Sequence, residues 1–282
     1  MKRVCIIITL SIFIINCKAQ EPGPLALTKK IFSRGSSTDS SKYITGEYKA
    51  HPNGNDLPHS IKPSFRLLDE DAISAVVNIT LTDSTGQQLD TYLYFIKDKS
   101  NVWKASAFRA LAMTGIIGAV NQQLKSLSGA QVDSIIHLPP DKNGIDHRDF
   151  KTRDEYNFML GNTTLVLAPD DTLIAHFKKN KALFNSIKDG LIAKGIMKTT
   201  DGTISMKDID NIKAQMHSIF IDEVMPDNES STNNLKFMIG GVLDNTVGYM
   251  YIKDKNDVPG MSSSLFILVR KIGDGWYLFK TT

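Results

Sequence analysis

The stretch that decides the fold is AISAVVNITLTDSTGQQLDTYLYFIKDKSNVWKASAF, residues 72–108. Val77, Ile79 and Leu81 alternate with polar residues, as they do in a strand with one buried face. Aromatic and β-branched residues follow, and turns rich in Asp, Asn, Ser and Gly separate the apolar segments. The pattern predicts a meander of antiparallel strands over residues 72–81, 89–97 and 102–108.

An amphipathic segment after the meander is the expected cover for its apolar face. Apolar residues recur there at steps of three and four, as on one side of a helix, at Met113, Ile116, Ile117, Val120, Leu124 and Leu127. We expect this stripe to pack on the sheet rather than on a membrane surface, because the polar side of the helix carries only one cation, Lys125.

The second half of the chain combines helices and strands again. Asp170 or Asp171 is expected to cap a long helix, and a second helix is predicted near residues 206–219. β-like segments then follow at residues 235–243, 247–253, 264–271 and 276–280. These elements predict a helical layer that packs on an antiparallel sheet.

We therefore predict an α+β fold of two units, each an antiparallel β-meander covered by one or two helices. The Pro pair and the turn residues at 139–144 cannot continue a helix, so they mark the boundary between the units. The units are an N-terminal α+β domain at residues 25–138 and a C-terminal α+β domain at residues 150–282. Residues 21–64 are rich in Gly, Pro and Ser, and we expect little regular structure there beyond a short helix at 27–32.

The start of the chain has the composition of a secretory signal peptide. Lys2 and Arg3 precede an apolar run at residues 4–15, and small or polar residues follow it. That run is shorter than the roughly 20 apolar residues that span a bilayer, so we expect no retained transmembrane anchor. We predict a signal peptide at residues 1–19 and an exported protein, located in the periplasm or anchored to a membrane as a lipoprotein.

The two cysteines of the chain, Cys5 and Cys17, both lie in this segment. Residues 14–17 resemble a lipoprotein box in which Cys17 becomes the lipidated first residue, although Asn16 stands where Gly, Ala or Ser is usual. Ordinary signal peptidase would instead cut before Gln20 and remove Cys17, and both alternatives stay open. In either case no intramolecular disulfide is expected, and membrane contact is expected only through a lipid on Cys17.

The charge and the histidine pattern argue against two classes of function. The formal net charge of +3 includes Lys2 and Arg3, so the mature chain lacks the basic field of a nucleic-acid-binding protein. The chain has six histidines, but even the nearest pair, His51 and His59, lacks the one-turn spacing of a zinc site. We predict no metal site, no cofactor and no nucleic-acid partner.

The sequence also lacks a recognisable catalytic pattern. It has no Gly-x-Ser-x-Gly elbow and no Gly-rich phosphate loop. Adjacent acids such as Asp222 and Glu223 stand at loop edges, where carboxylates are usually solvated. We therefore predict no catalytic residues and lean against enzymatic activity, while the ligand-binding residues stay unassigned.

Two resemblances to known families accompany these patterns. The meander at residues 72–108, with Trp103, resembles the sheet of nuclear-transport-factor-like and cystatin-like α+β domains, which implies a cone between sheet and helix that is either filled or a ligand pocket. Three segments of the second half resemble a family of uncharacterised exported bacterial proteins, many of them lipoproteins. They are residues 173–184 (LIAHFKKNKALF), 248–251 (GYMY) and 273–279 (GDGWYLF). That resemblance implies export and no particular activity.

The predicted export and the missing catalytic pattern lead to a functional hypothesis. We expect a non-catalytic cell-envelope protein that binds a ligand or a protein partner through one of its sheets. Two alternatives stay open: a hydrolase or isomerase with an Asp–His pair facing a conical pocket, and a structural lipoprotein tethered to a membrane. Aromatic side chains are the candidate contacts, because rings supply contact area at small entropic cost. They are Tyr92, Tyr94, Trp103, Tyr249, Tyr251 and Trp276, of which the two tryptophans are expected to fill the cores of their sheets.

Overall fold

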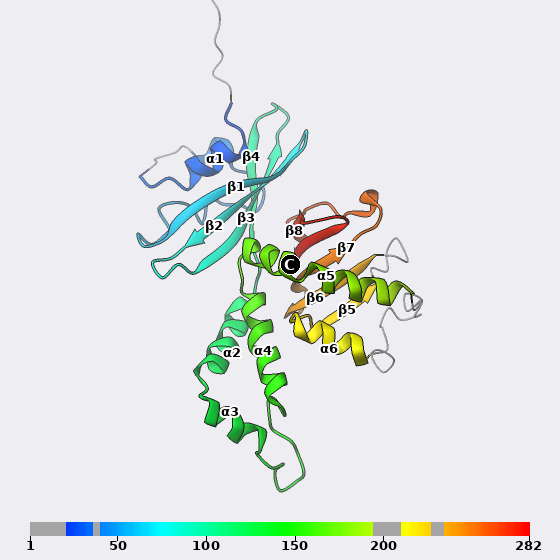
Figure 1. The fold of residues 1–282 in the computed structure, drawn as a ribbon. Coiled ribbons are helices and arrows are strands. Elements are labelled where there is room, and N and C mark those ends of the chain that lie inside the picture. The colour runs from blue at the N-terminus through cyan, green and yellow to red at the C-terminus, as the bar shows by residue number, and fades with distance from the viewer. Residues whose placement is uncertain (1–20, 36–39, 194–209, 227–233) are drawn as a thin grey trace, which may run out of the picture.

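The computed structural model describes residues 21–35, 40–193, 210–226 and 234–282 (Figure 1). This part of the chain contains six α-helices and two antiparallel sheets, so the predicted α+β class with two β units is confirmed. None of the helices described is both long enough and apolar enough to cross a membrane. The predicted signal peptide at residues 1–19, with Cys17, lies outside the described residues.

The N-terminal sheet is an antiparallel meander in chain order. Its strands are β1 (Lys62–Glu70), β2 (Ser74–Thr82), β3 (Gln88–Lys97) and β4 (Trp103–Ala110). Val77 and Leu93 are direct cross-strand partners on one face of the sheet, and both are fully buried. The strands predicted within residues 72–108 are confirmed as β2, β3 and β4, and β1 is an additional edge strand.

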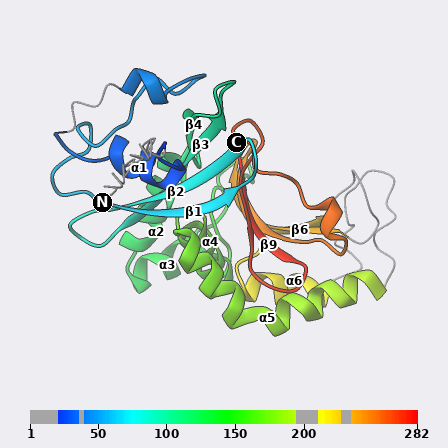
Figure 2. The same cartoon turned by 90° about the horizontal axis from the view of Figure 1, so that it is seen from above.

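Helix α1 (Pro24–Ile31) packs on one face of this sheet (Figure 2). Pro24 occupies the first helical position, where its missing N–H is not needed for a helical hydrogen bond. Leu27, Phe32 and Trp103 are buried together between the helix and the sheet. The space between α1 and the sheet is therefore filled with side chains.

The C-terminal sheet is antiparallel, with strand order β5-β6-β7-β9-β8. Its strands are β5 (Glu223–Pro226), β6 (Leu235–Val242), β7 (Asn245–Tyr251), β8 (Phe266–Lys271) and β9 (Trp276–Thr281). The sheet departs from a simple meander because β9 lies between β7 and β8. The long connection at residues 252–265 places β8 two positions from β7, and β9 then fills the position between them.

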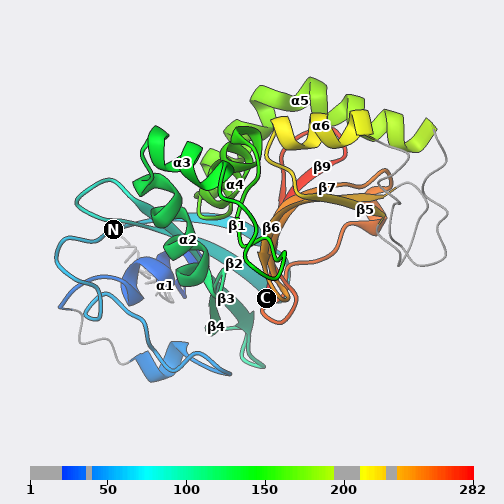
Figure 3. The same ribbon diagram turned by 90° about the horizontal axis from the view of Figure 1, so that it is seen from below.

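Two helices cover one face of the C-terminal sheet (Figure 3). They are α5 (Asp170–Ala193) and α6 (Asp210–Ser218). The predicted long helix is confirmed, with Asp170 as its first residue rather than its cap. The ring of Phe184 on α5 lies 5.0 Å from Tyr249 and 5.7 Å from Trp276, measured between centroids. Such aromatic contacts, together with burial, hold the helical layer on the sheet. Residues 206–209 of the predicted second helix lie outside the described residues.

Three further helices extend from the junction of the two sheets as an arm (Figure 1). They are α2 (Thr114–Ser126), α3 (Gly129–Ile136) and α4 (Arg153–Val166). The expectation that the apolar stripe of α2 packs on the N-terminal sheet is wrong for Met113, Ile116 and Val120, which are 42%, 54% and 37% exposed. The reason is α4, which the pattern did not predict and which packs against the face of α2 that carries Asn121 and Leu124.

The second face of the N-terminal sheet packs against the C-terminal unit. Val76, Tyr92 and Tyr94 belong to the same buried cluster as Phe177 and Phe237. The hydroxyl of Tyr94 donates a hydrogen bond to the carbonyl oxygen of Ile267 in β8 at 2.8 Å. The predicted boundary at residues 139–144 falls in the loop between α3 and α4, and the division into domains at 25–138 and 150–282 stays a prediction.

Candidate functional site

A cavity of about 540 Å³ lies where the β2–β3 turn, α2, the end of α4 and the start of α5 meet. We call it the junction groove. Carboxamide and hydroxyl side chains dominate its lining, and Lys125 is the one charged residue among those that line it. The polar lining residues are Gln87, Gln88, Asn121, Gln122, Lys125, Thr164 and Thr172, and Gly86, Gly118, Leu167 and Pro169 complete the wall.

Asn121 is a buried residue of this wall, with only 3% of its surface exposed. Its amide nitrogen donates to the hydroxyl oxygens of Thr163 and Thr164 on α4, at 2.9 and 2.8 Å. Both hydroxyls donate their own hydrogen to carbonyl oxygens one turn earlier in α4, so they can only accept from Asn121. The two threonines therefore fix the position of the amide nitrogen against α4.

The Oδ1 atom of Asn121 accepts no hydrogen bond within the described residues. Every fully buried side-chain nitrogen or oxygen in the described part of the chain has a partner, so this oxygen is not fully enclosed, and Asn121 is one of the residues that line the cavity. An acceptor that is already held in place meets a ligand without reorganisation. The junction groove thus offers one fixed acceptor for an N–H or O–H group.

Two other residues of α2 flank Asn121 along the groove. Gly118 lies three residues before it and Lys125 four residues after it, so all three share one face of the helix. A Cβ atom added at Gly118 would have no heavy atom within 4 Å, so a ligand can approach the backbone there. Lys125 is exposed and contributes one positive charge at this end of the groove.

A smaller cavity of about 90 Å³ adjoins the junction groove and shares Gln88 and Pro169 with it. Its volume corresponds to about three water molecules. Three carboxylates, those of Asp90, Asp170 and Asp171, line this cavity together with Arg66. It is therefore a polar and charged extension of the groove toward the C-terminal unit.

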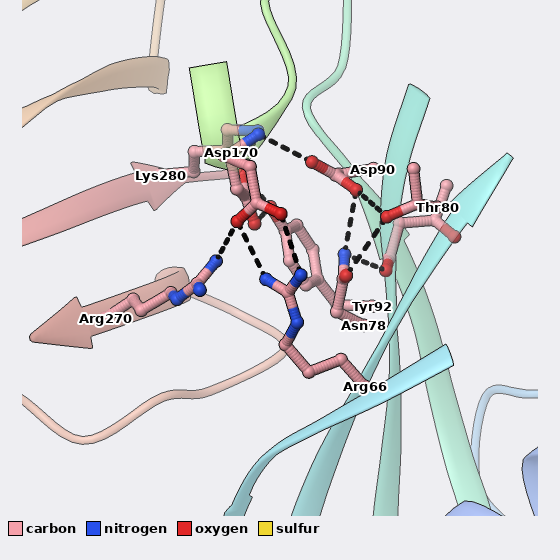
Figure 4. A network of polar contacts seen from close by, with 10 residues as sticks. Arg66, Asn78, Thr80, Asp90, Tyr92, Asp170, Arg270 and Lys280 are labelled. Atoms are coloured by element: carbon pink, nitrogen blue, oxygen red, sulfur yellow. Dashed lines mark hydrogen bonds and ion pairs between the residues drawn. The ribbon is translucent and has the colours of Figure 1, made fainter. Parts of the chain in front are cut away.

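A buried polar network forms the wall of the smaller cavity (Figure 4). Asp170 accepts hydrogen bonds from the hydroxyl of Tyr92 at 2.9 Å and from the ammonium of Lys280 at 2.7 Å. The side chains of Lys280 and Asp170 are only 5% and 3% exposed. Asp90 accepts from the backbone N–H of Asp170 at 2.6 Å, and it also accepts from Asn78 and Thr80. The network joins β2, β3, α5 and β9.

Burial governs the protonation equilibria within this network. It raises the pKa of Asp170 above the ordinary value, against the opposing attraction of Lys280. Burial likewise raises the pKa of the Tyr92 hydroxyl well above its ordinary value, so Tyr92 stays a donor to Asp170. Because its buried polar atoms all have hydrogen-bond partners, the network holds the N-terminal sheet against the C-terminal unit.

Asp171 stands beside the network at the surface. Arg66 of β1 donates to both of its carboxylate oxygens, at 2.8 and 2.7 Å, and Arg270 of β8 adds a third hydrogen bond at 2.9 Å. The two arginines lower the pKa of Asp171 below its ordinary value, and Arg66 has the larger effect. One carboxylate thus connects strands of both sheets to the start of α5.

The six aromatic candidates from the sequence lie away from the junction groove. Trp103 and Trp276 are buried in the cores of their sheets, as expected. Tyr94 and Tyr249 use their hydroxyls on backbone carbonyl oxygens, and Tyr92 uses its hydroxyl on Asp170. Tyr251 is partly buried, packs on Trp276 and lies 4.6 Å below the ammonium of Lys188.

The histidines also lie away from the groove and the smaller cavity. His51 contacts Asp56 at 2.7 Å and His147 contacts Asp141 at 3.0 Å, both on the surface. His176 is half-buried and hydrogen-bonded to the carbonyl oxygen of Ile219 at 3.0 Å. Across the described ranges, no group of three or more His, Cys, Asp or Glu side chains is placed to hold a metal ion.

The groove and the network define a class: an α+β protein with two antiparallel sheets, in which the buried residue Asp170 pairs with Lys280 of one sheet and with Tyr92 of the other, and a polar groove lies between the N-terminal sheet, α2, α4 and α5. No protein-family model matches the chain, and no curated protein or solved structure matches it. The site is therefore interpreted from its own residues.

Proposed function

We propose that this protein is a non-catalytic protein of the cell envelope that binds a polar ligand in the junction groove. The observation that carries the proposal is the Oδ1 atom of Asn121, a fixed acceptor without a partner in the wall of the groove. The volume of about 540 Å³ lies within the ~300–1,000 Å³ range of small-molecule sites. Gly118 keeps the space above α2 open for the ligand.

The placement of the titratable groups favours binding over acid–base catalysis. A hydrolase or isomerase would need an acid and a base that face a shared cavity. The pairs His51–Asp56 and His147–Asp141 have the required contact but stand outside the junction groove and the smaller cavity. Asp170 and Asp171 are already engaged by Lys280 and the two arginines.

The predicted signal peptide supports a location in the cell envelope for this binding activity. Lys2 and Arg3 followed by the apolar run at residues 4–15 support a signal peptide at residues 1–19. Cys17, in the lipoprotein-like box, is the proposed site of lipidation and the only contact with a membrane. The protein is then located at an envelope surface, where its groove binds a polar solute or a partner protein.

The two glycines of α2 provide a matched test. Gly118 lines the groove and Gly115 does not, yet a Cβ at either position has no heavy atom within 4 Å. The protein purified from the cell envelope is dialysed against the small-molecule fraction of a cell extract, and native mass spectrometry identifies any species that it enriches. We expect enrichment by the wild type and by Gly115→Leu, and none by Gly118→Leu. Equal enrichment by Gly118→Leu rejects the groove as the binding site.

A further inference from the structure

The side chains of the junction groove also indicate the class of ligand, and this step rests on the proposed function. We infer that the ligand is a segment of extended peptide chain that carries a carboxylate near Lys125. The argument uses three properties of the groove: the type of its polar groups, their spacing along α2, and the charge around them.

Side-chain carboxamides enter the groove from two sides. Gln87 comes from the β2–β3 turn and Gln88 from the start of β3, and Asn121 and Gln122 come from α2. The glutamine carboxamides each offer a donor and an acceptor, which pair with the C=O and the N–H of a peptide unit, whereas Asn121 offers only its acceptor because its nitrogen already donates to the two threonines. The fixed Oδ1 atom of Asn121 requires a donor in the ligand, and a backbone N–H supplies one.

The spacing of groups on α2 matches the repeat of an extended chain. Asn121 and Lys125 are four residues apart, which is about 6 Å along a helix axis. An extended peptide advances by about 6.6 Å in two residues. If the backbone N–H of one ligand residue donates to Asn121, the side chain two residues further along lies beside Lys125. The ligand can extend in the opposite direction over Gly118, where the space is open.

The surrounding charges and surfaces disfavour the other common polar ligands. A phosphorylated ligand carries about two negative charges, whereas the groove offers one cation, Lys125. A saccharide presents the C–H faces of its rings, which pack on aromatic side chains, and no aromatic residue lines the groove. A single carboxylate beside Lys125 is the charge that the groove accommodates.

Fluorescence polarisation with pools of labelled octapeptides tests the inference on the purified full chain. One pool has a fixed glutamate and an amidated end, a second has a fixed lysine in its place, and a third has a free C-terminal carboxylate with no acidic residue. We expect the glutamate pool to bind more tightly than the lysine pool. Tight binding of the third pool as well shows that a chain terminus supplies the carboxylate, and weak binding shows that a side chain supplies it.

Substitutions at Lys125 make the test specific. Lys125→Gln is expected to weaken binding of the glutamate pool about two- to fivefold, the size of an exposed ion pair. Lys125→Glu is expected to reverse the preference between the glutamate and lysine pools. Lys99→Glu, an exposed lysine of the β3–β4 turn outside the groove, is the control and should keep the wild-type preference.

Two outcomes overturn the peptide class while leaving the groove as a binding site. One is enrichment of a small molecule by the wild type but not by Gly118→Leu, without binding of any peptide pool. The other is displacement of that molecule by cellotetraose but by no peptide, which would identify a saccharide site. An unchanged preference in Lys125→Glu rejects the placement of the carboxylate.

Discussion

Lys280 is the residue whose loss the buried polar network tolerates least. It supplies the positive charge that faces Asp170 at 2.7 Å, and both side chains are almost fully enclosed. Removing one partner of a buried ion pair leaves the other charge without compensation, which costs about 3–5 kcal/mol. We expect Lys280→Met to lower the free energy of unfolding by about this amount in urea denaturation.

The control for this substitution is Lys271→Met. Lys271 ends β8 with an exposed side chain, and we expect a change within about 0.5 kcal/mol. The double variant Asp170→Asn with Lys280→Met removes both charges and should recover part of the loss. A loss below about 1 kcal/mol in Lys280→Met would show that Asp170 is not held by Lys280 in solution.

Asp171 gives the protein a predictable response to acid. Arg66 and Arg270 lower the pKa of Asp171 in the folded state. Its contribution to stability is therefore complete above the unfolded-state pKa and is lost as the pH falls from there through the lower folded-state pKa. Asp170 has the opposite sign, since a raised pKa in the folded state makes its ionisation unfavourable to folding as the pH rises. We expect Asp171→Asn to reduce the fall in unfolding free energy between about pH 5 and pH 3, measured by urea denaturation at each pH.

Asp274→Asn is the comparison for the acid response. Its carboxylate is fully exposed in the turn before β9, so we expect the wild-type pH dependence to persist. An Asp171→Asn variant with the same acid dependence as the wild type would mean that the two arginines do not hold the carboxylate in solution.

At the scale of elements, Gly161 shows how closely α4 approaches the turn before β5. A Cβ atom at Gly161 would lie 2.2 Å from Cε1 of Phe220, whose backbone is itself left-handed with φ of 58°. We expect Gly161→Ala to lower the free energy of unfolding by about 1–3 kcal/mol, because overpacking outweighs the gain in helix propensity. Thermal and urea unfolding provide the measurement.

Gly190 is the matched helical glycine. In α5 an added Cβ would meet Ile212 at 3.7 Å, which is ordinary van der Waals contact. Gly190→Ala is expected to be neutral or to stabilise the protein by up to about 1 kcal/mol. If Gly161→Ala behaves in the same way, the contact between α4 and Phe220 is loose.

The sequence predicted the elements that have a clear hydrophobic periodicity or a typical residue composition. Strands β2, β3 and β4 have alternation or aromatic residues, and α5 has the acidic residues Asp170 and Asp171 in its first turn. Strand β1 escaped prediction because it is an edge strand that begins beside Pro63 and ends at Asp69 and Glu70, so few of its side chains are buried. Helices α3 and α4 each bury only one or two side chains, so they show little of the apolar stripe that identifies a helix.

The junction groove could not be predicted because its residues carry no local pattern. Gln88, Asn121 and Thr164 are ordinary polar residues in three separate elements, and only the packing of α2 on α4 brings them together. Asp170 was predicted as a helix cap, but its pairing with Lys280 joins residues 110 positions apart. The aromatic residues drew attention in the sequence because of their size, and the same size makes them the core of both sheets.

At the scale of the whole molecule, we propose that lipidation of Cys17 determines where the protein is located. If Cys17 is lipidated, the full chain sediments with membranes, and Cys17→Ala remains in the soluble fraction. Circular dichroism should show the same secondary structure for both proteins, since Cys17 precedes the first described helix. Sedimentation of Cys17→Ala with membranes, or a soluble wild type, would reject the lipid anchor.

The fastening between the two units also sets an order of events during synthesis. Ribosomes deliver the chain from its N-terminus, and Asp170 leaves the ribosome 110 residues ahead of Lys280. Throughout that interval the carboxylate has no ammonium to face, so enclosing it between the sheets remains unfavourable. We therefore expect the N-terminal sheet to close on the start of α5 only after β9 has been made.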